Sequence, residues 1–200
     1  MKNALILILA CSCLLFAAGP AAAGETPAAK PADVTLETSL GKIVIRLYDD
    51  KAPITCANFR RYVREKYYDG LIFHRVIPGF VIQGGGFEPG MQVRNPPHPP
   101  IKNEARADLP NKRGTLSMAR TNQVNSATSQ FFVNLKDNPP LDHSGDNPAQ
   151  FGYAVFGEVV SGMEVVDRIA AQPTGMNKGF RDVPVTDAVI VHAYEGEGKP

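Results

Sequence analysis

The chain has 200 residues, of which 21 are basic and 20 acidic, so its formal net charge is +1 at pH 7. It contains no strongly basic run, so nothing in it attracts nucleic acid or an anionic membrane surface electrostatically. An apolar content of 44% in a chain of this length is typical of one globular domain.

The first 23 residues are typical of a secretory signal peptide. Lys2 gives a positive start, an apolar run follows from 4 to 18, and small alanines at 21–23 form a cleavage pattern. The apolar run is shorter than the about 20 residues that a membrane-spanning helix needs. We therefore expect cleavage after Ala23 and a periplasmic location. Lipid attachment at Cys11 is the less favoured alternative, because further apolar residues follow it directly.

Residues 24–33 are rich in proline, alanine and glycine and show no periodicity, which predicts a flexible tether. Cleavage also removes Cys11 and Cys13, so Cys56 remains alone and no internal disulfide can form. Cys56 lies in an apolar helical pattern. We expect it to be buried in the core and not catalytic.

A β-rich domain is expected over residues 34–194, followed by a C-terminal tail at 195–200. The β-prone runs 34–38 and 43–47 are joined by four residues and predict a hairpin. A helix should begin at Pro53 and end at Asp69-Gly70. The residues expected on its apolar face are Ala57, Phe59, Tyr62, Val63 and Tyr67.

Residues 73–87 hold two apolar runs that meet at Pro78-Gly79, a pair that favours a tight turn. The runs predict a second hairpin. Alternation places Phe73, Arg75 and Ile77 on one face of the first strand and His74 on the other. An arginine in so apolar a strand needs hydrogen-bonding partners or a function, because a buried charge is costly without them.

The rest of the chain predicts further short strands and a second helix. A proline-rich passage between Glu88 and Pro110 is expected to be an ordered loop. The remaining elements are strands at Thr115–Ala119, Gln130–Leu135, Tyr153–Val159 and Val185–Ala193 and a helix at Gly162–Ile169. Many short strands without strand–helix alternation indicate an antiparallel barrel and argue against a Rossmann sheet.

Three strings of the sequence, 73–87, 129–134 and 151–160, closely resemble the cyclophilin family of peptidyl-prolyl isomerases, most of all its secreted bacterial branch. The resemblance covers roughly residues 34–193 in the family's order. It implies a mainly β fold, a closed eight-stranded antiparallel β-barrel capped by two α-helices. It also implies catalysis of rotation about Xaa-Pro peptide bonds, with no covalent intermediate and no cofactor.

The resemblance also assigns site residues position by position. Arg75 stands at the family's catalytic arginine, and Gln83 stands at the neighbouring amide that helps to hold it. The walls of the proline pocket fall on Phe80, Val81, Phe132 and Leu141. The groove for the residues before proline falls on Ala119, Arg120, Thr121 and Gln130, and Tyr153 stands where many members carry histidine. Arg120 is expected to contribute mainly backbone hydrogen bonds.

The implied partners are proline-containing unfolded or flexible polypeptides, and the implied role is to assist the folding of exported proteins as a monomer. The four histidines lack metal-ligand spacing, so no metal is expected. Val81 and Arg120 replace the family's common methionine and asparagine. Pro140 replaces a tryptophan that eukaryotic members use to bind cyclosporin, so weak cyclosporin binding is expected.

An alternative from another class is a binding module that only grips proline-containing segments. Its support is limited to the departures at Arg120 and Pro140. A barrel that carries a ligand inside is less favoured, because small barrels with many bulky apolar strands are usually filled.

Overall fold

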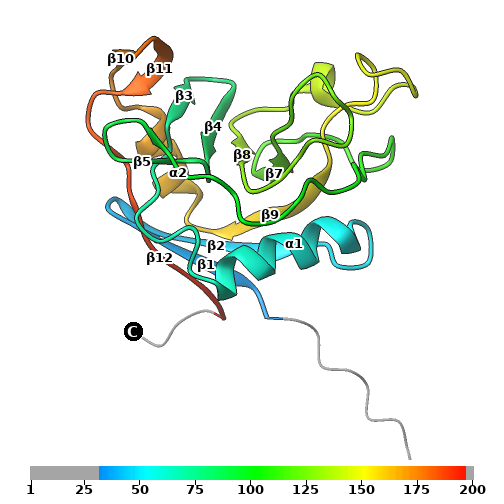
Figure 1. Ribbon diagram of the computed structural model, residues 1–200, viewed down its shortest axis with the longest axis horizontal. Helices are drawn as coiled ribbons and strands as arrows, with labels where there is room; N and C mark the ends of the chain where they lie inside the picture. The colour runs from blue at the N-terminus through cyan, green and yellow to red at the C-terminus, as the bar shows by residue number, and fades with distance from the viewer. Residues whose placement is uncertain (1–31, 197–200) are drawn as a thin grey trace, which may run out of the picture. The chain divides into compact units, whose positions relative to one another are not determined.

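The computed structural model describes residues 32–196 of the chain (Figure 1). The expected signal peptide, its cleavage site and nearly all of the tether lie outside these residues, as does most of the C-terminal tail. Within the described part, neither helix combines the length and apolar character needed to cross a membrane.

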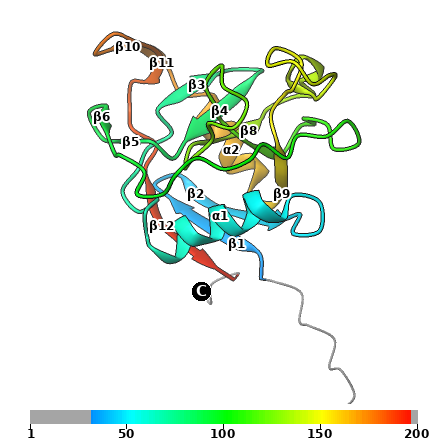
Figure 2. The same ribbon diagram turned by 45° about the vertical axis from the view of Figure 1, so that its right-hand side comes forward.

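Eight strands form one antiparallel sheet in the order β12-β1-β2-β9-β7-β8-β4-β3 (Figure 1). Their bounds are β1 Val34–Thr38, β2 Gly41–Leu47, β3 Arg75–Ile77, β4 Val81–Gly84, β7 Thr115–Met118, β8 Phe131–Asn134, β9 Val155–Ser161 and β12 Ile190–Glu195. Two short ribbons stand beside this sheet, β5 Phe87–Glu88 with β6 Gln92–Val93 and β10 Thr174–Asn177 with β11 Phe180–Pro184 (Figure 2). The expected mainly β fold with two helices is confirmed.

The sheet is an open half-barrel, so the closed barrel expected from the sequence is not confirmed. No ladder joins the edge strands β3 and β12. Residues 70–73, before β3, instead pair with residues 188–190 at the start of β12. The N–H of Gly70 donates to the carbonyl of Ile190 at 2.8 Å, and that of Phe73 donates to the carbonyl of Ala188 at 2.9 Å. A single bridge between Ile72 and Val189 lies between them. Local pairing at these two segments takes the place of a continuous ladder.

The first helix, α1, spans Pro53–Arg64 and packs against β9 and β12. It ends before the expected stop, and Lys66 just beyond it has a φ of 55°. The prediction that Ala57 lies on the buried face is wrong, because Ala57 is exposed. Two residues along a helix correspond to about 200°, so Ala57 and the buried Phe59 point to opposite sides.

Cys56 lies on the buried face of α1 and is confirmed as a core residue. Its side chain is fully buried, and Sγ donates to the carbonyl of Phe156 at 3.3 Å. Burial raises the pKa of the Cys56 thiol to about 12, so the thiol stays protonated and unreactive at neutral pH.

The hairpin around Pro78-Gly79 forms as expected. Arg75 pairs with Gln83 and Ile77 with Val81 across the β3–β4 ladder. The strand begins at Arg75, however, and not at Phe73. Phe73 is fully buried in the main core and does not share the partly exposed face of Arg75, so that part of the prediction is wrong.

The last third of the chain differs most from expectation. The single strand expected at 185–193 begins only at Ile190, and residues 174–184 form the β10–β11 hairpin, which the sequence analysis missed. Its turn contains Lys178 and Gly179, both with positive φ. The second helix, α2, spans Met163–Ala170 and packs against β2, β3 and β4, close to the expected position.

Candidate active site

Arg75 and Gln83 lie side by side on β3 and β4 because they are direct partners in the ladder. Nη1 of Arg75 donates to Oε1 of Gln83 at 3.4 Å, and Nε2 of Gln83 donates to Oε1 of Gln130 at 3.0 Å. The Gln83 amide therefore bridges the guanidinium to Gln130, the residue just before β8. The Arg75 side chain is 41% exposed, so it remains accessible to a ligand.

A second contact to Arg75 comes from Asp182 on β11. Oδ2 of Asp182 lies 3.9 Å from Nε of Arg75, which is an ion pair without a hydrogen bond. Asp182 has a φ of 60°, a conformation that aspartate tolerates better than most residues, and the β10–β11 register shifts there. Such a bulge redirects a side chain toward a neighbouring site. Both partners are about two-fifths exposed, so the pair is a weak constraint.

Next to Arg75 lies a hollow of about 150 Å³. Its lining consists of residues that the sequence analysis singled out: Arg75, Phe80, Val81, Gln83, Ala119, Arg120, Phe132, Leu141 and Tyr153. Phe132 is the ladder partner of Gln83, and its ring meets that of Tyr153 edge-on with centroids 5.6 Å apart. A guanidinium and an apolar wall thus face the same small space.

The two remaining predicted residues, Thr121 and Gln130, line an adjoining hollow of about 190 Å³. This second hollow shares Gln83, Ala119 and Arg120 with the first. The structure therefore brings every predicted site residue into one groove, although their individual roles remain predictions.

A chain of three buried asparagines supports the walls of the first hollow. Nδ2 of Asn138 donates to the carbonyl of Phe80 at 3.1 Å and to Oδ1 of Asn134 at 2.8 Å. Asn134 in turn donates to Oδ1 of Asn111 at 3.3 Å, and Nδ2 of Asn111 donates to the carbonyl of Leu141 at 3.0 Å. The backbones of Phe80 and Leu141, two walls of the hollow, are thereby connected through groups that are at most 2% exposed. Satisfied buried networks of this kind are rigid.

The Arg120 side chain is held at the rim of the groove by three backbone carbonyls. Its Nε, Nη1 and Nη2 donate to Gly152, Thr121 and Pro148 at 3.0, 2.9 and 3.0 Å. Its guanidinium carbon lies 4.9 Å from the centroid of the Tyr153 ring. The side chain thus takes part in building the groove, which goes beyond the backbone contribution expected for this position.

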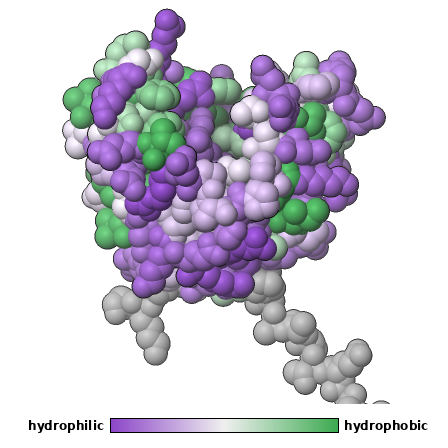
Figure 3. Space-filling model, viewed as in Figure 1, coloured by the Kyte–Doolittle hydropathy of each residue, from purple (hydrophilic) through white to green (hydrophobic). Residues whose placement is uncertain are grey.

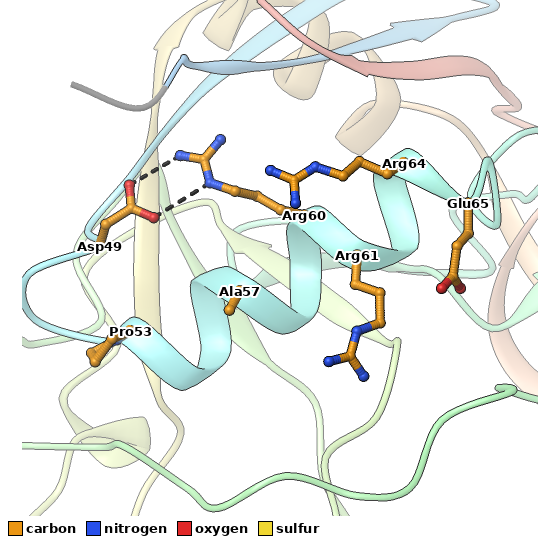
Figure 4. A pocket seen from close by; sticks show the side chains of 7 residues that line it. All are labelled: Asp49, Pro53, Ala57, Arg60, Arg61, Arg64 and Glu65. Atoms are coloured by element: carbon orange, nitrogen blue, oxygen red, sulfur yellow. Dashed lines mark hydrogen bonds and ion pairs between the residues drawn. The ribbon is translucent and has the colours of Figure 1, made fainter. Parts of the chain in front are cut away.

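A larger hollow of about 590 Å³ runs along the outer side of α1 (Figure 4). Most of its polar side chains already have partners: Arg60 donates to both carboxylate oxygens of Asp49, and Arg64 and Glu65 pair with Glu195 and His98, which lie outside the lining. It has few apolar walls, so it offers no seat for a proline ring. Within residues 32–196, no group of three or more histidine, cysteine or acidic residues is placed to hold a metal ion.

Comparison with known proteins decides the family. The family model described as cyclophilin type peptidyl-prolyl cis-trans isomerase/CLD matches residues 33–195. The chain belongs to the cyclophilin family.

Peptidyl-prolyl cis-trans isomerases of two bacteria are similar to this chain over most of their length. Peptidyl-prolyl cis-trans isomerase B of Escherichia coli is 54% identical over 157 residues, which cover 78% of this chain and 95% of the relative. A peptidyl-prolyl cis-trans isomerase of Acinetobacter baylyi is 51% identical over 158 residues, which cover 79% and 82%.

A solved cyclophilin has a similar fold. The crystal structure of a cyclophilin type peptidyl-prolyl cis-trans isomerase from Cryptosporidium parvum, in the presence of the dipeptide Ala-Pro, has a TM-score of 0.68 and 26% identity. The match covers 83% of this chain and 99% of that one. The family model, the two relatives and the solved structure all agree with the cyclophilin resemblance seen in the sequence.

Sequence reasoning missed the residues that hold this cyclophilin's groove from behind or from the side. Asp182 was missed because its hairpin was not recognised, although the Asn177-Lys178-Gly179 turn was a usable signal. The three asparagines carry no local signal, because their partners are far away in the sequence.

Proposed function

We propose that this chain catalyses cis-trans isomerisation of Xaa-Pro peptide bonds in the groove around Arg75. The observation that carries the proposal is the placement of the Arg75 guanidinium and the apolar walls Phe80, Phe132 and Leu141 around one small hollow. The apolar walls suit a proline ring, and the guanidinium suits the amide beside it.

The reaction needs no bond cleavage. Rotation is slow because resonance gives the C–N bond partial double-bond character, with a barrier of about 18–20 kcal/mol. Resonance is lost in the twisted state, and the prolyl nitrogen then gains a lone pair that accepts a hydrogen bond. A catalyst lowers the barrier by binding this twisted state better than either planar isomer.

Arg75 supplies donors that suit the twisted state. Its guanidinium is always protonated and offers five N–H groups, of which the Gln83 contact uses one. The contact with Gln83 and the ion pair with Asp182 restrain its position before substrate arrives. Preorganised donors of this kind stabilise a transition state without having to reorient during the reaction.

The test is an exchange measurement by NMR on proline-containing peptides, with wild type and an Arg75→Ala variant. We expect the variant to lose about 100-fold or more in kcat/KM, the effect typical of removing one transition-state donor. An Arg61→Ala variant, changed on the outer side of α1, should keep the wild-type rate. An Arg75→Ala variant as fast as wild type would contradict the proposal. A pure binding module would retain its cellular role in that variant.

We further propose that the chain is exported to the periplasm, where it assists folding of exported proteins as a monomer. The positive start, apolar run and alanine cleavage pattern of residues 1–23 support export. The intact mass of the native protein tests this proposal. A mass equal to that of residues 24–200 supports export with cleavage after Ala23. An uncleaved chain contradicts export, and a lipid-bearing chain contradicts cleavage after Ala23.

We also propose that cyclosporin binds this groove weakly. Pro140 lies exposed beside Leu141 and has neither an aromatic ring nor an N–H donor. A Pro140→Trp variant should therefore be inhibited at lower cyclosporin concentrations than wild type. Equal inhibition of the two proteins would contradict the proposal.

A further inference from the structure

The groove extends beyond the two hollows described above. A third hollow of about 380 Å³ adjoins the first and shares Arg120, Leu141 and Tyr153 with it. Its other walls are Asn122, Pro140, Pro148 and Ala149. Arg120 lines all three hollows, so this residue lies beside the proline seat and on both flanks of it.

The charge along this groove differs from that of the whole chain. Among the described residues that line the three hollows, Arg75 and Arg120 are cationic and none is lysine, aspartate or glutamate. The full chain carries a formal net charge of only +1. The positive charge of the groove is therefore local, and a local cationic groove attracts acidic ligands and repels basic ones.

Two acidic residues that contact or directly follow lining residues, Asp182 and Asp142, compensate the two arginines unequally. Asp182 lies 3.9 Å from Nε of Arg75 and offsets part of that charge. The carboxylate of Asp142, the residue after Leu141, accepts hydrogen bonds from the backbone N–H and the side-chain amide of Asn111. Arg120 forms no ion pair within residues 32–196, and all three of its hydrogen bonds go to neutral carbonyls.

Arg120 is also held in position before any ligand binds. Three of the five N–H groups of its guanidinium donate to carbonyls, so two donors have no partner among the described residues. The guanidinium also lies over the Tyr153 ring. A guanidinium already held in place loses little conformational entropy when a carboxylate binds to it.

We propose that Arg120 determines substrate specificity, so that the groove prefers Xaa-Pro segments with an aspartate or glutamate directly before or directly after the proline. The inference rests on the proposed isomerase function and names the substrate class of the same groove. The site is partly exposed, and ion pairs in such places change rates by a few-fold and not by orders of magnitude. We expect a preference of about threefold to fivefold for an acidic residue over its amide.

The experiment measures kcat/KM by NMR exchange for matched peptides that differ only beside the proline, with glutamate, glutamine or lysine at that position. A second set carries the same three residues after the proline. Wild type should prefer glutamate over glutamine in at least one set and should disfavour lysine. Raising the salt concentration should reduce the preference, because exposed charges are screened.

The variants are Arg120→Gln and, as a control with the same change in net charge, Arg61→Gln on α1. The glutamate-to-glutamine ratio should fall to about one in Arg120→Gln and stay at the wild-type value in Arg61→Gln. Because each ratio is taken within one protein, a general loss of activity cancels. If Arg120→Gln does not fold, Arg120→Met, which also removes the charge, should likewise bring the ratio to about one.

A wild-type ratio of one in both peptide sets, or an unchanged ratio in Arg120→Gln, would overturn the inference while leaving the isomerase function intact. Failure of wild type to accelerate exchange in any peptide would instead overturn the proposed function.

Discussion

At the scale of single residues, Arg75 at the start of β3 and His74 just before it show how alternation separates two kinds of polar side chain. Arg75 projects into the groove and is 41% exposed, whereas His74 is 5% exposed and its ring lies 4.4 Å from that of Phe87. Nδ1 of His74 has no hydrogen-bond partner among the described residues. The interior position thus leaves this imidazole with little that would stabilise a positive charge.

Stability in acid should depend on His74. Burial lowers the pKa of His74 from 6.5 to about 4, so the native state resists its protonation. Above about pH 6.5 the ring is neutral in both states and has no effect. As the pH falls from about 6.5 to about 4, the unfolded chain binds a proton that the native state does not, so the free energy of unfolding decreases by about 3 kcal/mol.

Urea unfolding at pH 7 and pH 4.5 checks this prediction. A His74→Gln variant should lose less stability than wild type between the two pH values, whatever its stability at pH 7. His143→Gln serves as the control, because it replaces a histidine that is only partly buried. The Nδ1 of His143, unlike that of His74, has a hydrogen-bond partner, the carbonyl of Phe151 at 2.9 Å. The same pH effect in His74→Gln as in wild type would show that another group is responsible.

At the scale of secondary structure, α1 depends on a residue far away in the sequence. Its N-cap, Ala52, has no side chain that can accept a hydrogen bond. The carboxylate of Glu104 accepts from the N–H groups of Ile54 and Thr55, at 3.1 and 2.8 Å, and from the Thr55 hydroxyl at 2.7 Å. Glu104 thus satisfies free N–H groups at the positive end of the helix dipole.

Removal of this cap should destabilise the fold without changing the groove. We expect Glu104→Ala to lower the free energy of unfolding by about 1–2 kcal/mol, the usual cost of a lost N-cap. Glu164→Ala is the matched control: Glu164 also lies in the first turn of a helix, α2, but that helix has no side-chain cap bond. Urea unfolding of both variants decides the point. Equal losses would mean that the effect of Glu104 is only that of a charge near a helix end.

At the scale of the whole molecule, the groove exists because the sheet order places β3, β4, β8 and β7 side by side. Arg75, Gln83 and Phe132 lie in successive strands of this order and face the same side. Loops that follow β7 and β8 then bring Arg120 and Leu141 to the same hollow. The walls are rigid because they belong to the sheet or are tied to it through the asparagine chain.

Local signals in the sequence were sufficient for much of the fold. Alternation and the Pro78-Gly79 turn predicted the hairpin that places Arg75 and Gln83 on neighbouring strands, because turn geometry and side-chain alternation act over a few residues. The register that makes these two residues direct partners was not predicted. The resemblance of three strings to the cyclophilins then named the residues that line the groove.

Other features could be known only from the folded chain. The open edge of the sheet, the cap from Glu104, the approach of Asp182 to Arg75 and the carbonyls that hold Arg120 all join segments that are distant in sequence or belong to separate loops. No local pattern encodes such contacts, because they depend on which elements become neighbours when the apolar core is buried. The sequence by itself therefore determined the residue types of the groove and the short-range geometry of its hairpin. The contacts that hold Arg75 and Arg120 in place were decided by tertiary packing.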